Sequence, residues 1–166
     1  EHYQRTRFFL DHHPYDEIFI ALYKLPARPP MMNVLAAAYM SQIGDNSFAI
    51  FQLIFLLLNL LVVLPCVLLL PVLGAKHRRF SLAVLTFLVA ASPMFMQNLT
   101  WTWPRLLTTF YALVGMSFYL RGWWKNDPAR MVAAFVALAI GALVHYSIGP
   151  YIVVLLAHYV VIFFAP

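Results

Sequence analysis

The stretch that decides the fold covers residues 47–74 and reads SFAIFQLIFLLLNLLVVLPCVLLLPVLG. It contains no charged residue, and about 20 predominantly apolar residues are enough for a helix to cross a bilayer. Asp45, Asn46 or Ser47 can cap the N-terminus of such a helix, and Pro65 and Pro71 are residues that can kink one. The stretch therefore predicts a transmembrane helix that starts near Ser47.

The composition of the whole chain agrees with a membrane environment. Hydrophobic residues make up 63% of the 166 residues and charged residues only 10%, which is too apolar for a soluble domain of this length. The net charge of +5 comes from short basic clusters between apolar runs, and the lack of a continuous basic stripe argues against a nucleic-acid partner. We therefore expect an integral membrane protein whose main partner is the lipid bilayer.

Four further apolar runs extend the membrane region. They cover residues 80–96, 106–120, 131–146 and 151–165, and short polar stretches separate them. Gly149 and Pro150 are expected to end the helix of the fourth span, because neither residue suits a helix interior. Residues 47–166 are thus predicted to form an all-α, polytopic transmembrane bundle of about five spans.

Residues 1–46 are more polar and are predicted to form an extracytoplasmic loop with interfacial helices. One helix is expected to start at Pro14, which would place Asp16 and Glu17 in its first turn. A second helix is expected to follow Pro30 and to continue to Ile43, a length too short to cross a bilayer comfortably. The first helix is therefore expected to lie along the membrane surface, and the second is expected to be interfacial or re-entrant, both on the outer face.

The distribution of Lys and Arg orients the expected bundle. The loops AKHRRF (75–80) and RGWWKNDPAR (121–130) carry the basic clusters, so both are expected on the cytoplasmic side. The second and third expected spans lie between these two loops, so both loops must be on the same side of the membrane. The number of spans and the distribution of basic residues therefore agree. Residues 1–46, the loop QNLTWTWPR (97–105) and the break at 145–150 are then expected outside the cytoplasm, where polar residues gather and where we expect a functional site.

Asp16 and Glu17 are the only adjacent acids in the chain. A carboxylate in the first turn of a helix is held ionised by the helix dipole, which suits a general base or a cation ligand. Acids are also ordinary residues of a first helical turn, so a structural role stays open. The surrounding segment DHHPYDE (11–17) matches no defined metal motif, and its residues predict no metal site.

Four other residues on the expected outer face are candidates for substrate binding. Arg28 and Arg105 can bind a phosphate through charge-assisted hydrogen bonds, or they can extend to the lipid headgroups. His145 can contact a substrate, or it can be a buried histidine with one hydrogen-bond partner. Trp103 can stack on a sugar ring or belong to an interfacial aromatic belt. The residues alone leave both interpretations open for each position.

The order of these features resembles a known family. The Asp-Glu pair is followed by RPPMMNVLAAAYM (28–40) and by a long span after IGDNSFAIF (43–51); a later span closes at Ser92-Pro93 and another ends in YLRGWW (119–124). From about Tyr15 to Pro166, this pattern resembles the N-terminal part of the GT-C glycosyltransferases, in the branch that includes protein O-mannosyltransferases and aminoarabinose transferases. The resemblance implies that the chain is an N-terminal transmembrane fragment of a longer protein.

In function, the resemblance implies transfer of a sugar from a polyprenyl-phosphate-linked donor to an acceptor. The active site would face outside the cytoplasm, in the cell envelope, at a bacterial inner membrane or its equivalent. Asp16 would be the base that deprotonates the acceptor, with Glu17 beside it, and Arg28 and Arg105 would neutralise the leaving phosphate. Some members of the family use a divalent cation and others do not, so the resemblance leaves a metal open, and it leaves the acceptor unspecified.

A non-catalytic polytopic membrane protein, such as a transporter or a scaffold, is the alternative. A transporter is expected to carry ionisable residues or broken helices near the midplane, often in repeated halves. The expected spans contain no charged residue, and the sequence has no internal repeat. The pattern therefore favours the transferase.

Overall fold

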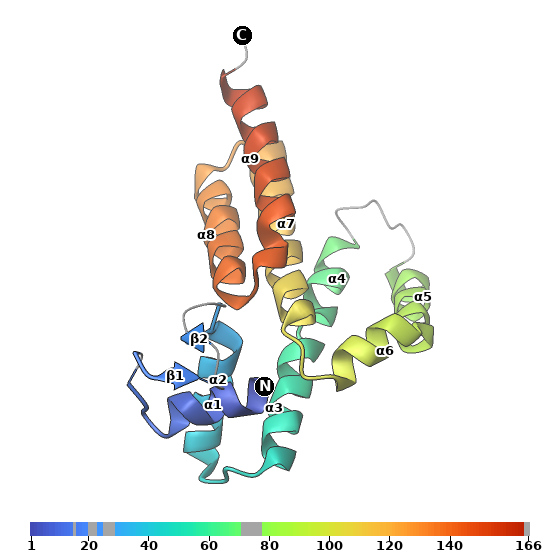
Figure 1. Ribbon diagram of the computed structural model, residues 1–166. Coiled ribbons are helices and arrows are strands. Elements are labelled where there is room, and N and C mark those ends of the chain that lie inside the picture. Colours follow the sequence, from blue (N-terminus) through green and yellow to red (C-terminus); the bar gives the residue numbers. More distant parts are fainter. Residues whose placement is uncertain (15, 20–22, 25–28, 71–77, 165–166) are drawn as a thin grey trace.

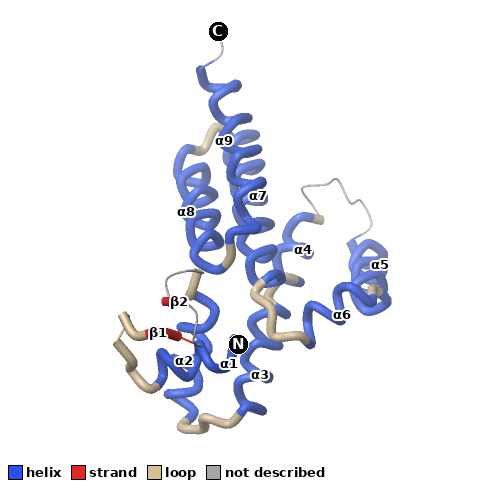
Figure 2. The backbone as a smooth tube through the Cα atoms, in the orientation of Figure 1, coloured by secondary structure: helices blue, strands red, loops and turns tan. Residues whose placement is uncertain are grey.

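The computed structural model describes residues 1–14, 16–19, 23–24, 29–70 and 78–164, and helices dominate it (Figure 1, Figure 2). The helices are α1 (His2–Leu10), α2 (Met31–Ile43), α3 (Phe48–Leu60), α4 (Val63–Leu69), α5 (Arg78–Ala91), α6 (Pro93–Thr100), α7 (Arg105–Lys125), α8 (Pro128–Val144) and α9 (Gly149–Phe164), with a short 3-10 turn, η2 (Tyr146–Ile148). Two short strands, β1 (Ile18–Phe19) and β2 (Tyr23–Lys24), form an antiparallel pair. The predicted all-α class is confirmed.

One core joins α2, α3 and the start of α7. Met32 and Met40 of α2 belong to the same buried cluster as Phe51 and Phe55 of α3, and Leu107 of α7 is also part of it. The centroids of the two phenylalanine rings lie 4.5 Å apart. The segment expected to be an extracytoplasmic loop therefore shares a core with the first expected span.

The helices α7 and α8 run antiparallel and pack closely (Figure 1). Two glycines of α7 allow this approach, because a Cβ at Gly115 would lie 2.9 Å from Leu138 Cγ and a Cβ at Gly122 would lie 3.0 Å from Met131 Sδ. Ala134 of α8 lies at the same interface and is fully buried. Small residues of this kind let two helix backbones come close, as they do in membrane bundles.

Among the described residues, one helical segment, Phe48–Leu69, is long and apolar enough to cross a membrane. It begins where the first span is expected, with Ser47 Oγ accepting a first-turn backbone N–H at 3.3 Å. A turn at Leu61 separates α3 from α4, because Pro65 has no N–H to donate to the Leu61 carbonyl. Pro71 and the rest of the expected span lie outside the described residues.

The second expected span, residues 80–96, is divided between two helices. It consists of α5 and α6, which meet at Ser92 with a bend of 69°. Ser92 Oγ accepts the Phe95 N–H at 3.2 Å and Pro93 takes the first helical position, so this pair starts a new helix. α8 and α9 are apolar but have 17 and 16 residues. By length and composition, the described part of the chain holds one spanning helix, or two if the bent pair forms one span.

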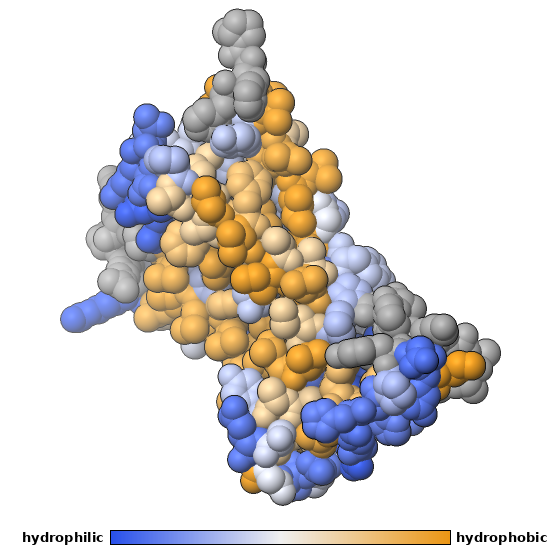
Figure 3. Space-filling view, turned by 90° about the vertical axis from the view of Figure 1, so that its left-hand side faces the viewer, coloured by the Kyte–Doolittle hydropathy of each residue, from blue (hydrophilic) through white to orange (hydrophobic). Residues whose placement is uncertain are grey.

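A broad apolar surface covers the middle of the molecule. Figure 3 shows this surface between hydrophilic side chains that gather at the upper left and at the lower right of the view. On α9, Val153, Val154 and Val161 are 65%, 64% and 62% exposed. Such a surface is unfavourable in water and suits an apolar neighbour.

The prediction of a helix that starts at Pro14 is wrong. The first helix is α1, which ends at Leu10, and His12 follows with a φ of +55°. Asp16 and Glu17 lie in a turn before β1. Isoleucine and phenylalanine favour an extended pair over a helix here, since β-branched and aromatic residues suit strands. The two acids therefore do not lie in the first turn of a helix.

Two other boundaries test the expected order of helices. The helix after Pro30 is confirmed as α2, and Gly44 ends it in the left-handed conformation, with a φ of +74° that favours glycine. The break between the last two helices lies earlier than expected, because α8 ends before His145, which is extended. Gly149 and Pro150 begin α9 instead of ending the preceding helix, in line with the preference of proline for a first helical turn.

Candidate functional site

A pocket of about 210 Å³ lies where several helix ends meet. It is formed by α1, Pro29 two residues before α2, the start of α7 and the end of α8, and we call it the basic pocket. The residues that line it are His2, Arg5, Pro29, Trp103, Pro104, Arg105, Val144, His145 and Tyr146. Three of the residues predicted to bind substrate therefore come together in this pocket: Trp103 and Arg105 are close neighbours in the chain, and His145 follows about 40 residues later.

Arg105 is the first residue of α7 and lies beside Trp103. Its guanidinium carbon is 4.4 Å from the centroid of the Trp103 ring, a distance at which a cation and an aromatic face attract each other. The Trp103 ring also stacks on Trp101, with centroids 6.0 Å apart. Arg105 is exposed at the positive end of the α7 dipole, so both its side chain and the helix end favour an anion.

His145 follows the last residue of α8 and is held by the next turn. Its Nδ1 accepts the Ser147 N–H at 3.1 Å and lies 2.9 Å from Ser147 Oγ. Because Nδ1 accepts a backbone N–H, the neutral ring carries its proton on Nε2. The ring stacks on exposed Tyr146, with centroids 4.1 Å apart. His145 is therefore half-buried and fixed at the edge of the basic pocket.

Two residues of α1 in the basic pocket were not predicted. Arg5 is 2% exposed and pairs with Glu1 at 2.8 Å. His2 Nδ1 lies 3.3 Å from Asn33 Oδ1. Burial is the main cause that lowers the pKa of His2; the Asn33 hydrogen bond opposes the shift, and the positive charge of Arg5 adds to it. The spacing of Glu1 and Arg5 suits a helix, but it does not say what that helix packs against.

The predicted acids lie outside the basic pocket. Asp16 and Glu17 are both exposed in the turn before β1, and Glu17 Oε2 is 2.9 Å from His13 Nδ1. An exposed pair of this kind contributes little to stability. Neither acid is among the described residues that line the pocket. The structure thus brings together the predicted substrate contacts without the predicted base.

Two further predictions for the site concern Arg28 and a metal ion. Arg28 lies outside the described residues, whereas its neighbour Pro29 lines the basic pocket. In the part of the chain that the structure describes, no group of three or more His, Cys, Asp or Glu side chains could hold a metal ion. The chemistry that the basic pocket offers is therefore that of positive and aromatic side chains.

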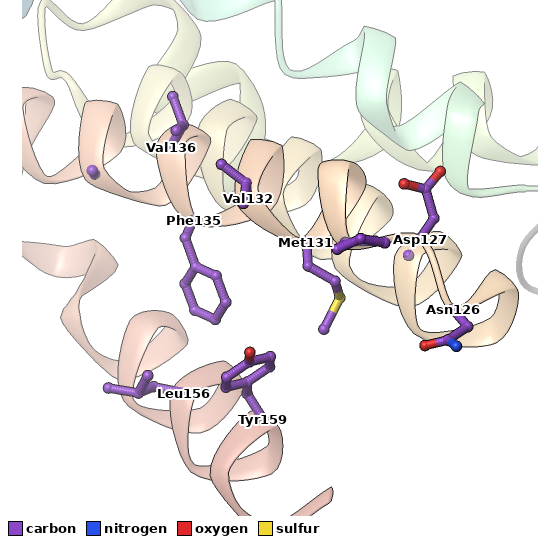
Figure 4. Close-up of a pocket in the computed structure, with 11 residues that line it drawn as sticks. Asn126, Asp127, Met131, Val132, Phe135, Val136, Leu156 and Tyr159 are labelled. Atoms are coloured by element: carbon purple, nitrogen blue, oxygen red, sulfur yellow. The ribbon is translucent and has the colours of Figure 1, made fainter. Parts of the chain in front are cut away.

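A second, larger space lies at the other end of α7 and α8. This apolar groove holds about 840 Å³ and runs between α8 and α9. Figure 4 shows Met131 and Phe135 of α8 opposite Tyr159 of α9, with Asn126 and Asp127 at one end of the groove. The groove has no cluster of positive side chains among its lining residues, so it differs in chemistry from the basic pocket.

Comparisons with known protein families, with characterised proteins and with solved structures find no match to this chain. The protein is therefore classified by its own fold and its own pocket. It is an all-α protein with one helical segment in the described residues that could span a membrane, and with a basic pocket at the start of α7.

Proposed function

We propose that this chain belongs to a membrane enzyme that transfers a sugar from a polyprenyl-phosphate-linked donor to an acceptor outside the cytoplasm. The observation that carries this proposal is the meeting of Arg105, Trp103 and His145 with Arg5 and His2 in the basic pocket. Positive side chains suit the phosphate of such a donor, through charge-assisted hydrogen bonds. The face of a tryptophan suits a sugar ring.

In the membrane, five spans are proposed: α3 with α4, the bent pair α5 and α6, and α7, α8 and α9. The exposed apolar surface of α9 supports this arrangement, and the 21 residues of α7 extend over about 30 Å. α7 and α9 run in one direction and α8 in the opposite one, as successive spans do (Figure 1). The basic loop at residues 121–130 would then be cytoplasmic, and the basic pocket would open on the other side.

The reaction would exchange one bond at the anomeric carbon of the sugar. The acceptor oxygen bonds to that carbon while the bond from the carbon to the phosphate oxygen breaks. The acceptor proton passes to Asp16 or Glu17, and the polyprenyl phosphate leaves with the electron pair, its charge neutralised by Arg105 and Arg5. Since both acids lie outside the pocket, the turn that carries them has to approach it when donor and acceptor bind.

Binding of undecaprenyl phosphate to the full-length protein in detergent micelles tests the role of the basic pocket. Arg105→Gln is expected to weaken binding about tenfold, because a charge-assisted bond to the phosphate is lost. Lys125→Gln, at the opposite end of the same helix, is the matched control and should bind as the parent does. Equal loss in the two variants would mean that general positive charge, and not the pocket, attracts the phosphate.

The acids are tested separately, by transfer from a panel of polyprenyl-phosphate sugars with membranes that contain the full-length protein. Asp16→Asn or Glu17→Gln is expected to lower the transfer rate about 100-fold without changing the affinity for undecaprenyl phosphate, because only the proton acceptor is lost. Unchanged transfer in both variants would remove the pair from the mechanism.

A non-catalytic membrane protein, such as a transporter or a scaffold, is the second candidate. The exposure of Asp16 and Glu17, and the pairing of Glu17 with His13, favour it, because a base that acts on a bound acceptor has to reach the binding site. Binding of undecaprenyl phosphate without transfer of any sugar in the panel would support this candidate over the enzyme.

A further inference from the structure

Asn59 is a polar residue inside the helix that could span a membrane. It lies near the end of α3, within Phe48–Leu69, and it is 0% exposed. An amide in apolar surroundings is costly unless its polar atoms are hydrogen-bonded. The partners of a buried polar residue in a span therefore point to its role.

The Asn59 side chain joins three backbone groups of one distant segment. Its Nδ2 donates to the carbonyl of Asn98 at 3.3 Å and to the carbonyl of Trp103 at 3.1 Å. Its Oδ1 accepts the N–H of Leu107 at 3.3 Å. Only this orientation of the amide satisfies all three groups, since the nitrogen is the donor and the oxygen the acceptor.

These bonds replace a missing helix cap. The N–H of Leu107 belongs to the first turn of α7, where backbone N–H groups have no partner within the helix. Pro104 is the N-cap residue of α7 and provides no side-chain hydrogen bond there. A capping role that serine, aspartate or asparagine usually fills within the same segment is therefore filled by Asn59 from α3.

The groups that Asn59 holds lie on both sides of Arg105. The Trp103 carbonyl comes two residues before Arg105, and the Leu107 N–H comes two residues after it. Trp103 and Arg105 both line the basic pocket and contact each other. A change in the backbone between residues 103 and 107 would therefore move both side chains together.

We propose that Asn59 is the positioning residue of the basic pocket. It fixes the backbone of residues 98–107 so that Trp103 and Arg105 present one face to the phosphate of the donor. The link to a phosphate rests on the proposed function, whereas the hold on the backbone does not. Asn59 itself does not line the basic pocket and acts through the segment that it binds.

The test uses the full-length protein with Trp103 as its only tryptophan in residues 1–166, after Trp101→Phe, Trp123→Phe and Trp124→Phe. Asn59→Leu removes all three hydrogen bonds, and Asn59→Asp keeps the size but can donate to neither carbonyl. Ile54→Ala is the matched control, because Ile54 is buried in the same helix and its truncation lowers stability by leaving a cavity. Acrylamide quenching of Trp103 and binding of undecaprenyl phosphate are measured for each variant.

Both Asn59 variants are expected to raise the quenching of Trp103 roughly twofold, because the segment that carries it opens locally. They are also expected to weaken binding of undecaprenyl phosphate about tenfold, as the pocket loses its fixed arrangement. Ile54→Ala should lower the unfolding temperature and leave both readouts unchanged. If Asn59→Leu does not fold, Asn59→Asp decides the outcome.

Three results separate this inference from the proposed function. Unchanged quenching in the Asn59 variants would overturn the positioning role. Changed quenching with unchanged affinity for undecaprenyl phosphate would overturn the link between Asn59 and the pocket. A parent protein that does not bind undecaprenyl phosphate would overturn the proposed function, while the quenching of Trp103 would still decide the role of Asn59.

Discussion

The two ends of α7 are similar in composition and different in surroundings. The first end carries Arg105 beside Trp103, and the last end carries Arg121 and Lys125 beside a tryptophan pair. At the first end, α1 and the end of α8 converge on the arginine and form the basic pocket. At the last end, Arg121 Nη2 donates to the carbonyl of Leu68 at 2.8 Å, which satisfies one of the free carbonyls at the end of α4.

This difference shows that the contacts of the polar residues, and not the residue types alone, distinguish a candidate binding site from an ordinary helix end. At the last end of α7, Asn126 takes the left-handed conformation that ends a helix, and Asp127 caps α8 by accepting two backbone N–H groups. The polar groups there complete helix ends. At the first end, the cap comes from Asn59 on another helix, which leaves the side chains of residues 103–105 available to the pocket.

The largest effect is expected from Gly141, on α8 near the basic pocket. A Cβ at this position would clash with Ile148 Cδ1 and lie 3.0 Å from Tyr111 Cβ. Ile148 is 1% exposed, so it has little room to move. Gly141→Val is expected to lower the free energy of unfolding by about 1–3 kcal/mol and to displace the turn that carries His145. Thermal unfolding in detergent micelles measures the effect, with exposed Ala139→Val on the same helix as control. Equal unfolding temperatures for the two variants would contradict the prediction.

A smaller effect is expected at the other end of α7, from Asp127. Its Oδ1 accepts the N–H groups of Ala129 and Arg130 at 3.1 and 3.2 Å. Asp127→Ala should destabilise the protein by about 1 kcal/mol through loss of this cap, and it should leave the affinity for undecaprenyl phosphate unchanged. Asp127→Asn is the control, since asparagine caps helices almost as well. A fall in affinity with Asp127→Ala would show that the two ends of α7 are coupled.

Arg121 and Arg105 compare the two ends directly. Arg121→Gln should lower the free energy of unfolding by about 0.5–1 kcal/mol, because the exposed hydrogen bond to Leu68 is lost, and should leave phosphate binding unchanged. Arg105→Gln should weaken phosphate binding and leave the free energy of unfolding unchanged. Unfolding temperature and undecaprenyl phosphate affinity, measured for both variants, form the test. The same pattern in the two variants would mean that the ends do not differ in function.

Local patterns predicted the parts of the fold that depend on neighbouring residues. The helix after Pro30, the helix start at Ser47 and the interruption by Pro65 each follow from one residue with a strong backbone preference beside an apolar run. Trp103 lies just before α7, in the loop that was expected ahead of the third span, whereas the helix end before His145 lies earlier than expected.

Features that depend on packing could not be predicted in the same way. The rule that proline starts a helix failed at Pro14, because a short strand pair formed where the helix was expected. Arg5 reaches the basic pocket only through the packing of α1, which no local pattern reports. Asn59 did carry a readable signal, since a lone amide in an apolar run needs partners, but the sequence does not say that they flank Arg105.

The smallest effect is expected from pH, at His2 in the basic pocket. Its pKa in the folded protein is lowered below 6.5, chiefly by burial, so the unfolded chain takes up a proton more readily. The stability contribution of neutral His2 is therefore full above pH 6.5 and is lost as the pH falls through 6.5 toward the lowered pKa. His2→Gln should reduce the fall of the unfolding temperature between about pH 7.5 and about pH 5.5. His12→Gln, in the exposed turn after α1, is the matched control. If His2→Gln and the parent lose stability equally over this range, burial of His2 in the pocket does not penalise its charged form.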